Sequence, residues 1–382
     1  MKRIEVLDST SAEIASRRRR PGVVLNFALF AFFIVGFGGI GAAVEKNAAS
    51  EKVPVKVIFD TDMYTDFDDA GALACLHAMA DAGECEILAT ISNTRDCMSV
   101  AMCEIVNAYY GRPEIPVGCA REIGKSGAGP AHLRRYEATV KKYAKWVKHL
   151  NSSDAPDANA VYRRVLAAQP DHSVVICSVG FLTNLRRLLE TKPDDVSPLD
   201  GKALVAQKVK LWVAMACKYP NGREYNSAND PESSRIALEN WPTTVVFTDF
   251  EYGKDCFAGR MLAESGRVGS PVADVFAGNI PTREEIRKDP ALQLRRGYGM
   301  GGRSAWDETA VLIAVRGTER YFNTERGTYR MVGPGGENEW APDENGPHLR
   351  VTEKLAKAEV AKIIDELMCR APRQARAEGA DM

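Results

Sequence analysis

The sequence predicts an α/β domain built on an open, mostly parallel sheet flanked by helices. Short runs rich in β-branched residues alternate with longer segments whose apolar residues recur at helical spacing. The most acidic stretch of the chain lies between the first predicted strand and the first predicted helix, which is where open α/β sheets bind ligands. With 382 residues and 45% hydrophobic content, the chain can bury the large core of such a domain.

The first 50 residues are predicted to lie outside this domain. Four arginines at 17–20 precede an apolar run from Val23 to Val44. Because about 20 apolar residues can span a bilayer, this order indicates a secretory signal peptide or an uncleaved signal anchor. A buried hydrophobic helix is the alternative. The expected location is therefore periplasmic or extracellular, or at a membrane to which residues 23–44 attach the protein.

The rest of the chain is predicted to form one domain over residues 51–370, followed by a disordered tail at 371–382. The formal net charge of −1 provides no long-range field for nucleic acid, so no nucleic-acid partner is expected. Nine cysteines occur without a CxxC pair or a Cys/His cluster, which argues against a zinc site. Nothing in the sequence excludes a homo-oligomer.

The first strand of the domain is predicted at residues 55–59, and an acidic loop follows it directly. Five carboxylates fall within ten positions: Asp60, Asp62, Asp66, Asp68 and Asp69. Carboxylates this close repel one another unless a cation neutralises them, and a hard divalent cation takes oxygen ligands. A metal site is therefore predicted, with a solvated acidic turn as the alternative.

Polar residues also follow the later predicted strands, at 86–92, 113–118, 173–179, 209–215 and 241–247. Asn93 ends one strand, where its amide suits a sugar hydroxyl or an Asx turn. Glu224 and Asn226 are two residues apart, so on an extended segment both can address one ligand. Asp307 leads into an apolar helix, either as its cap or as a carboxylate that closes the metal site.

The end of the chain is predicted to contain a short strand at 329–332, a polar loop at 334–347 and an amphipathic helix at 352–368. Residues 119–160 carry glycines followed by basic and aromatic residues, and have no clear pattern of their own.

Asp60-Thr61-Asp62, followed by Asp66-Phe67-Asp68-Asp69-Ala70-Gly71-Ala72-Leu73, resembles the amino-terminal signature of the inosine-uridine-preferring nucleoside hydrolases. Three weaker motifs occur in the order expected for that family: Gly180-Phe181-Leu182-Thr183-Asn184, Glu224-Tyr225-Asn226 and Trp306-Asp307. This chain has two extra residues between Asp62 and Asp68, no glycine in that loop, and Trp306 where many members have histidine. The resemblance covers about residues 55–320 and implies a Rossmann-like sheet, the nucleoside hydrolase fold.

The resemblance also implies an activity, which is Ca²⁺-dependent hydrolysis of the N-glycosidic bond of ribonucleosides to base and ribose. It assigns the Ca²⁺ ligands to Asp62, Asp69, Asp307 and the carbonyl of Val179. It assigns the nucleoside contacts to Asp68, Asn93, Met215, Asn221, Glu224 and Asn226. Within this set Asp68 would hold the 2′-hydroxyl, Asn226 the 3′-hydroxyl and Glu224 the 5′-hydroxyl.

Two catalytic residues follow from the same comparison. Asp62 would accept the proton of the attacking water. Trp306 would stack on the base and favour its protonated form, because an indole N–H is not an acid at neutral pH. An acid from residues 119–160, a candidate lid by resemblance, is the alternative.

Other functions stay open on the sequence. A protein of this fold could bind a ribosyl or other sugar ligand without turnover, or cleave another N-glycoside. A phosphoryl-transfer enzyme with Asp60 as nucleophile is a further alternative, although it leaves the three later motifs unexplained.

Overall fold

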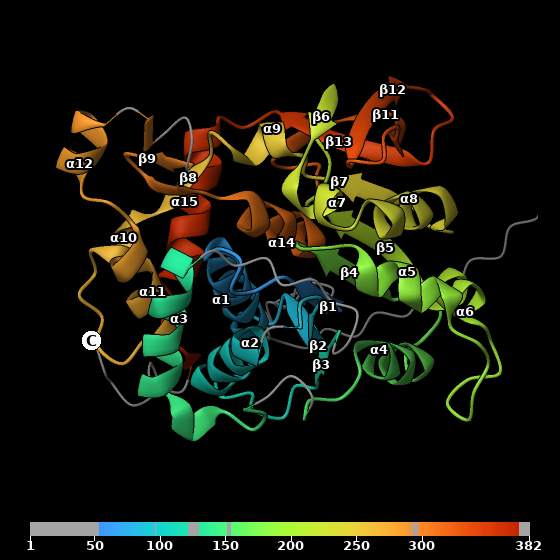
Figure 1. The fold of residues 1–382 in the computed structure, drawn as a ribbon, viewed down its shortest axis with the longest axis horizontal. Helices are drawn as coiled ribbons and strands as arrows, with labels where there is room; N and C mark the ends of the chain where they lie inside the picture. Colours follow the sequence, from blue (N-terminus) through green and yellow to red (C-terminus); the bar gives the residue numbers. More distant parts are fainter. Residues whose placement is uncertain are drawn as a thin grey trace, which may run out of the picture. The chain divides into compact units, whose positions relative to one another are not determined.

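β-branched segments form the middle of a ten-stranded sheet in the computed structural model, which describes residues 53–95, 97–120, 130–150, 154–289, 291–292 and 297–373. The strand order is β3-β2-β1-β4-β5-β7-β13-β11-β12-β6 (Figure 1). The first seven strands in this order are parallel: β3 (Val117–Cys119), β2 (Cys85–Ser92), β1 (Val55–Thr61), β4 (Val174–Ser178), β5 (Val209–Ala214), β7 (Val245–Phe247) and β13 (His348–Glu353). The predicted fold class, a mostly parallel sheet flanked by helices, is confirmed.

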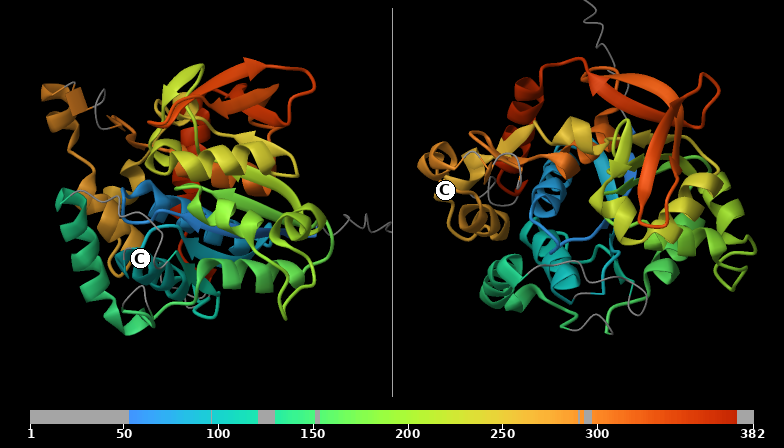
Figure 2. Two further views of the ribbon diagram at one scale, coloured as in Figure 1. Left: turned by 45° about the vertical axis from the view of Figure 1, so that its right-hand side comes forward. Right: turned by 45° about the horizontal axis from the view of Figure 1, so that its top comes forward.

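Three antiparallel strands extend the sheet beyond β13: β11 (Phe322–Met331), β12 (Glu337–Pro342) and β6 (Asn221–Arg223). Figure 2 shows the β11–β12 hairpin in orange-red at one end of the domain. The prediction of a polar loop over 334–347 is wrong, because β12 occupies its centre. A separate small sheet consists of β8 (Phe257–Gly259), β10 (Gly302–Ser304) and β9 (Tyr298–Gly299).

Helices cover both faces of the parallel sheet, and side chains alternate between these faces along each strand. Val57 and Phe59 of β1 pack into one hydrophobic cluster and Ile58 into the other. The first cluster contains residues of α1 (Asp68–Asp81), α2 (Cys97–Tyr109), α11 (Pro271–Asn279), α14 (Trp306–Arg316) and α15 (Lys357–Met368). The second contains residues of α4 (Ala158–Ala167), α5 (Thr183–Glu190), α6 (Gly201–Lys208) and α8 (Pro231–Asn240).

The remaining helices are short or peripheral: α3 (Pro130–Lys142), η1 (Ala144–Trp146), α7 (Tyr225–Asn229), α9 (Phe250–Gly253), α10 (Arg260–Ala263) and α12 (Arg283–Lys288). Helix α1 has the most enclosed position, because it packs against β2, α14 and α15 and is buried from Asp68 to Met79. Gly71 permits this packing, since a Cβ there would collide with the Glu308 carboxylate of α14.

Residues Lys52–Met382 group as one compact unit, separate from Met1–Glu51. The predicted signal segment at 23–44 and the tail from 374 lie outside the described residues, so the export or membrane attachment of the protein remains a prediction. Within the described ranges, no helix is long and apolar enough to cross a membrane.

Candidate functional site

The acidic loop connects β1 to α1 and folds back on itself. The Thr65 hydroxyl and backbone N–H donate to the Asp62 carboxylate and carbonyl, at 2.7 and 3.0 Å. Tyr64 has a φ of 92°, a left-handed conformation that is strained for a residue with a side chain. Its ring packs edge-on against Tyr136, at 5.3 Å between centroids. This turn keeps Asp62 buried beside the start of α1.

One carboxylate of the loop meets two carboxylates from helices. Asp66, Asp69 and Asp307 each present one oxygen, and these oxygens lie within 4.8 Å of one another. Asp69 is in the first turn of α1 and Asp307 in the first turn of α14, and the two helices pack side by side (Figure 1). Helix N-termini favour negative charge, so both carboxylates sit where the backbone supports them. Asp69 also accepts a hydrogen bond from the Thr61 hydroxyl.

The electrostatics of this acidic centre suit a cation. Burial, and then the charges of neighbouring carboxylates, raise the pKa values of four residues well above the usual range: Asp62, Asp68, Asp69 and Asp307. The Asp62 charge contributes to the raised pKa of both Asp69 and Asp307, which places Asp62 next to the cluster. A cation would reverse these shifts by favouring the ionised form of each carboxylate.

Asp66 belongs to the acidic loop predicted to bind a metal but was not expected as a specific ligand, and Arg303 was not predicted to belong to this centre. Burial alone would raise the pKa of Asp66, but the charge and hydrogen bond of Arg303 outweigh it and bring the pKa to about 2. The signal for Asp66 was present in the sequence, since it is the additional carboxylate of a loop with two extra residues. Nothing in the sequence marked Arg303, because it reaches the loop only through the tertiary fold.

The residues predicted to contact the sugar meet where β4 and β5 end. The Asn226 amide nitrogen donates to the carbonyls of Val179 and Met215, at 3.2 and 3.0 Å. Glu224 caps α7, and its two oxygens accept from Asn226 N, Ser227 N and Oγ, and Cys217 N at 2.8–3.1 Å. Asn221 is the exception, because it is exposed in β6, opposite Glu339 of β12.

Asn93 and Asp60 form a buried network beneath the acidic loop. The Asn93 amide donates to Asp60 at 2.6 Å and accepts from the Phe181 N–H at 3.1 Å. Asp60 also accepts from the Tyr162 hydroxyl and the Asn184 amide, at 2.6 and 3.1 Å. Burial outweighs these hydrogen bonds and raises the pKa of Asp60 to about 6. Both residues are completely inaccessible to solvent, so in this structure they organise the strand ends.

Trp306 is half-buried at the start of α14. Its indole N–H donates to the Phe250 carbonyl at 3.0 Å, and its ring stacks on the Phe250 ring at 5.4 Å between centroids. The Arg303 guanidinium lies 5.0 Å from the centroid of the Trp306 ring. Any contact of Trp306 with a base must therefore be made by the ring, since the N–H is already donated.

Part of the candidate lid contacts the acidic loop. Helix α3 packs against α2 and α11, and the hydroxyl of its buried Tyr136 donates to the Asp66 carbonyl at 2.6 Å. Lys142 and Tyr143 both bind Asp274 of α11, at 2.6 and 2.8 Å. Residues 121–129 and 151–153 lie outside the described residues, and the role of the segment as a lid remains a prediction.

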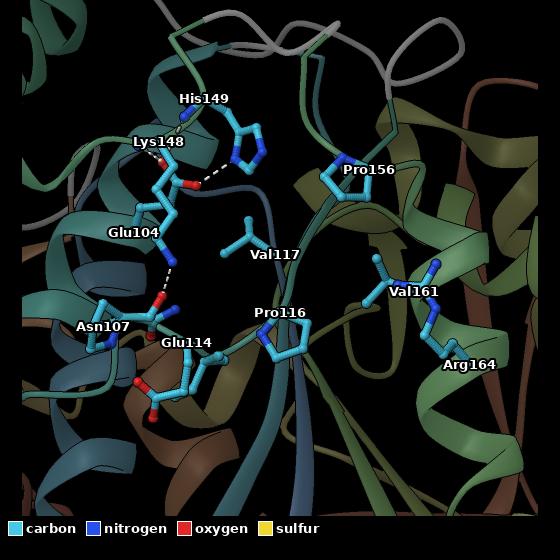
Figure 3. Close-up of a pocket in the computed structure, with 12 residues that line it drawn as sticks. Glu104, Asn107, Glu114, Pro116, Val117, Lys148, His149, Pro156, Val161 and Arg164 are labelled. Atoms are coloured by element: carbon cyan, nitrogen blue, oxygen red, sulfur yellow. Dashed lines mark hydrogen bonds and ion pairs between the residues drawn. The ribbon is translucent and has the colours of Figure 1, made fainter.

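A separate cavity of about 240 Å³ opens beside the edge strand β3 (Figure 3). Its lining includes Glu104, Lys148, His149 and Arg164. Two carboxylates line it, Glu104 and Glu114, and Glu104 is already engaged by the backbone N–H groups of Lys148 and His149 and by the His149 ring, at 2.5–3.1 Å. None of the predicted site residues lines this cavity, so it is not the acidic centre.

Comparison with known proteins gives one family and one fold. The family model described as inosine-uridine preferring nucleoside hydrolase matches residues 57–366. A search of curated proteins finds no match.

Similar solved structures include an inosine-uridine preferring nucleoside hydrolase from Bacillus anthracis, with 15% identity, a TM-score of 0.59, and coverage of 82% of this chain and 99% of that one. A purine-preferring ribonucleoside hydrolase from Gardnerella vaginalis has 16% identity, a TM-score of 0.60, and coverage of 84% and 99%. The type III effector protein XopQ, complexed with adenosine diphosphate ribose, has 15% identity, a TM-score of 0.58, and coverage of 84% and 94%. At such identities the likeness shows the fold alone.

Proposed function

This chain belongs to the inosine-uridine-preferring nucleoside hydrolase family, and we propose that it hydrolyses the N-glycosidic bond of ribonucleosides with the help of Ca²⁺. Enzymes of this family are glycosidases that act on nucleosides. The observation that carries the proposal is the meeting of Asp66, Asp69 and Asp307, whose oxygens lie within 4.8 Å of one another. Buried carboxylates at this spacing are stable only when a cation or protons compensate their charge.

The donor set fits a hard cation. Ca²⁺ takes six to eight oxygen ligands and accepts both carboxylates and backbone carbonyls. We assign these ligands to Asp62, Asp66, Asp69, Asp307 and the carbonyl of Val179. One oxygen of Asp68 is buried and accepts no hydrogen bond within the described part of the chain, so it can receive a ligand. When bound, Ca²⁺ would neutralise the cluster and make a water more acidic.

Residues of the chain would carry out the proton transfer and hold the sugar. Asp62 would accept the proton of the water, with one of its oxygens held in place by the Thr65 hydroxyl at 2.7 Å. Asp68 would accept a hydrogen bond from the 2′-hydroxyl through Oδ1, which accepts no hydrogen bond in the described part of the chain and lies 3.7 Å from Arg303 Nε. The negative charge around the anomeric carbon would favour an oxocarbenium-like transition state.

The sugar would lie over the ends of β4 and β5. We assign the 3′-hydroxyl to Asn226 and the 5′-hydroxyl to Glu224, with Met215 along the ribose. Asn93 would act mainly by holding the turn after β4, because both ends of its amide are bonded. Asn221, which the resemblance also assigned to the nucleoside, is exposed in β6 and does not meet the other predicted sugar contacts.

Departure of the base would be assisted by Trp306. Its ring is held by Phe250 and lies beside Arg303, which makes this part of the site aromatic and cationic. Stacking on an electron-rich ring favours a cationic, protonated base. The acid itself would come from the lid segment or from solvent.

The test measures ribose release from a panel of purine and pyrimidine nucleosides by the full chain. We expect release with Ca²⁺, its loss in a chelator, and recovery when Ca²⁺ is added back. Asp307→Ala should not recover, whereas Asp171→Ala, which removes an exposed carboxylate paired with Lys208 and outside the centre, should behave as the wild type. Equal release with and without chelator would refute the metal requirement.

A second candidate is binding of a larger ribosyl ligand, or cleavage of another N-glycoside. The observation that favours it is the aromatic and cationic pair of Trp306 and Arg303 where family members have an acid. One protein of this fold is complexed with adenosine diphosphate ribose. Binding of this ligand without ribose release from any nucleoside would support the second candidate.

Phosphoryl transfer by Asp60 has no such support, because three side chains enclose its carboxylate.

A further inference from the structure

Building on the proposed cation site, we propose that Arg303 is an internal counter-ion of the acidic centre, which positions Asp66 and limits how tightly the centre binds a cation. One guanidinium nitrogen lies 2.8 Å from Asp66 Oδ2, and Arg303 Nε lies 3.7 Å from Asp68 Oδ1. The Arg303 side chain is only 12% exposed. Its charge is therefore directed at the carboxylates and not at solvent.

The position of the guanidinium is fixed by three rings. Its central carbon lies 5.6 Å from the ring centroids of Phe67 and Tyr298, and 5.0 Å from that of Trp306. Its backbone is held in β10, which pairs with both β8 and β9. A planar guanidinium suits such aromatic surroundings, and it keeps its proton at any physiological pH. The positive charge is thus permanent and cannot be withdrawn from the centre.

Asp66 is shared between this arginine and the candidate metal ligands. One of its oxygens accepts from Arg303, and the other accepts from the Asp68 N–H at 3.2 Å. The same carboxylate is one of the three groups whose oxygens converge within 4.8 Å. A cation that binds Asp66 must therefore share it with Arg303, at the cost of repulsion between two positive charges.

This arrangement predicts the sign of a mutation effect. A cation bound at Asp66 would lie close to the guanidinium, and like charges so close repel even when partly screened, so Arg303 should weaken cation binding by about tenfold or more. Neutralising Arg303 should therefore tighten binding of Ca²⁺. An arginine that only supported the fold would have the opposite effect, because its loss would disorder the ligands.

The experiment measures Ca²⁺ affinity of the metal-free full chain by calorimetry. We expect Arg303→Gln to bind Ca²⁺ about tenfold or more tightly and to lose turnover, and Arg303→Lys to stay close to the wild-type affinity. In an Asp66→Asn background, Arg303→Gln should give a smaller gain, because the two charges no longer compete for Asp66 although they still repel each other. Arg316→Gln is the matched control: it removes an arginine that pairs with Glu84 at the other end of α14, and its affinity should be unchanged.

Weaker or unchanged Ca²⁺ binding by a folded Arg303→Gln protein would overturn the proposal. The same gain in the Asp66→Asn background as in the wild type would overturn the part assigned to Asp66. If the wild type neither binds Ca²⁺ nor releases ribose, the proposed function fails. In that case, Ca²⁺ binding by the Arg303→Gln variant alone would still support the counter-ion role of Arg303. If no variant bound Ca²⁺, that role would be rejected as well.

Discussion

Asp307→Asn should stabilise the metal-free protein while it removes cation binding. Asp307 and Asp69 present oxygens within 4.8 Å of each other in a buried centre. Two unit charges at that distance repel by about 3.5 kcal/mol at an effective dielectric constant of about 20. Burial raises the pKa values of both groups, so any proton they share reduces this repulsion. We therefore expect a gain of about 1–3 kcal/mol in the free energy of unfolding.

The assay is denaturant unfolding of the purified full chain, in chelator and in excess Ca²⁺. Ca²⁺ at about 100 times its dissociation constant should stabilise the wild type by about 2.7 kcal/mol and leave Asp307→Asn unchanged. Asp365→Asn is the control, since Asp365 is a partly buried carboxylate that accepts from the Gly259 N–H, outside the cluster. Its response to Ca²⁺ should equal that of the wild type. An Asp307→Asn protein less stable than the wild type in chelator would refute the electrostatic reasoning.

Three further predictions follow from the site. Burial raises the folded-state pKa of Asp60 to about 6, and it raises the pKa values of Asp62, Asp68, Asp69 and Asp307 as well. Above the unfolded pKa of 3.8, these groups therefore bind more protons in the native state than in the unfolded state. Unfolding in chelator should therefore become easier as the pH rises from about 4 through 6, and Ca²⁺ should weaken this dependence in the same titration. Gly180→Ala should lower stability by about 2 kcal/mol or more and reduce turnover, because a Cβ there would overlap the Asp62 N–H and the Asn93 amide; thermal unfolding and ribose release measure both effects. Trp306→Phe should keep part of the nucleoside turnover and Trp306→Ala less, and unchanged steady-state rates in both variants would exclude a stacking role.

The strand, acidic loop and helix at the start of the domain could be predicted because local sequence determines each part. β1 is a β-branched run, and α1 begins at a pair of carboxylates that a helix N-terminus favours. The strand at 337–342 could not be predicted in this way. Asn338 is completely buried there and pairs with the backbone of Lys218 at 2.8 and 2.9 Å, so a polar residue occupies a core position. Only the distant partner makes that burial favourable.

The residues of the candidate site likewise fall into those that could be predicted from the sequence and those that could not. Asp69 and Asp307 could be identified because the motifs around them resemble those of a known family, and each lies in the first turn of a helix. Glu224 and Asn226 were identified in the same way, but the extended segment expected for them is wrong, because Glu224 caps α7 and Asn226 lies in that helix. Arg303 could not be identified, since its significance depends on the distance between its side chain and a loop far away in the sequence. The position of Asn93 at a strand end could be predicted, but its structural role could not, because its hydrogen bonds to Asp60 and Phe181 form only in the folded chain.

Asp66 and Arg303 together explain how this chain accommodates a further carboxylate in its acidic loop. Relative to the family motif that the loop resembles, two more residues separate Asp62 from Asp68, and Asp66 adds a charge to a centre that already has several buried carboxylates. An uncompensated charge of this kind would destabilise the loop by several kcal/mol. The arginine from β10 offsets it, and the Tyr136 hydroxyl donates a hydrogen bond to the Asp66 carbonyl. The loop and the segment before Asp307 therefore have to be considered as one unit: exchanging either alone for the shorter form of the motif should destabilise the centre, whereas exchanging both should restore it.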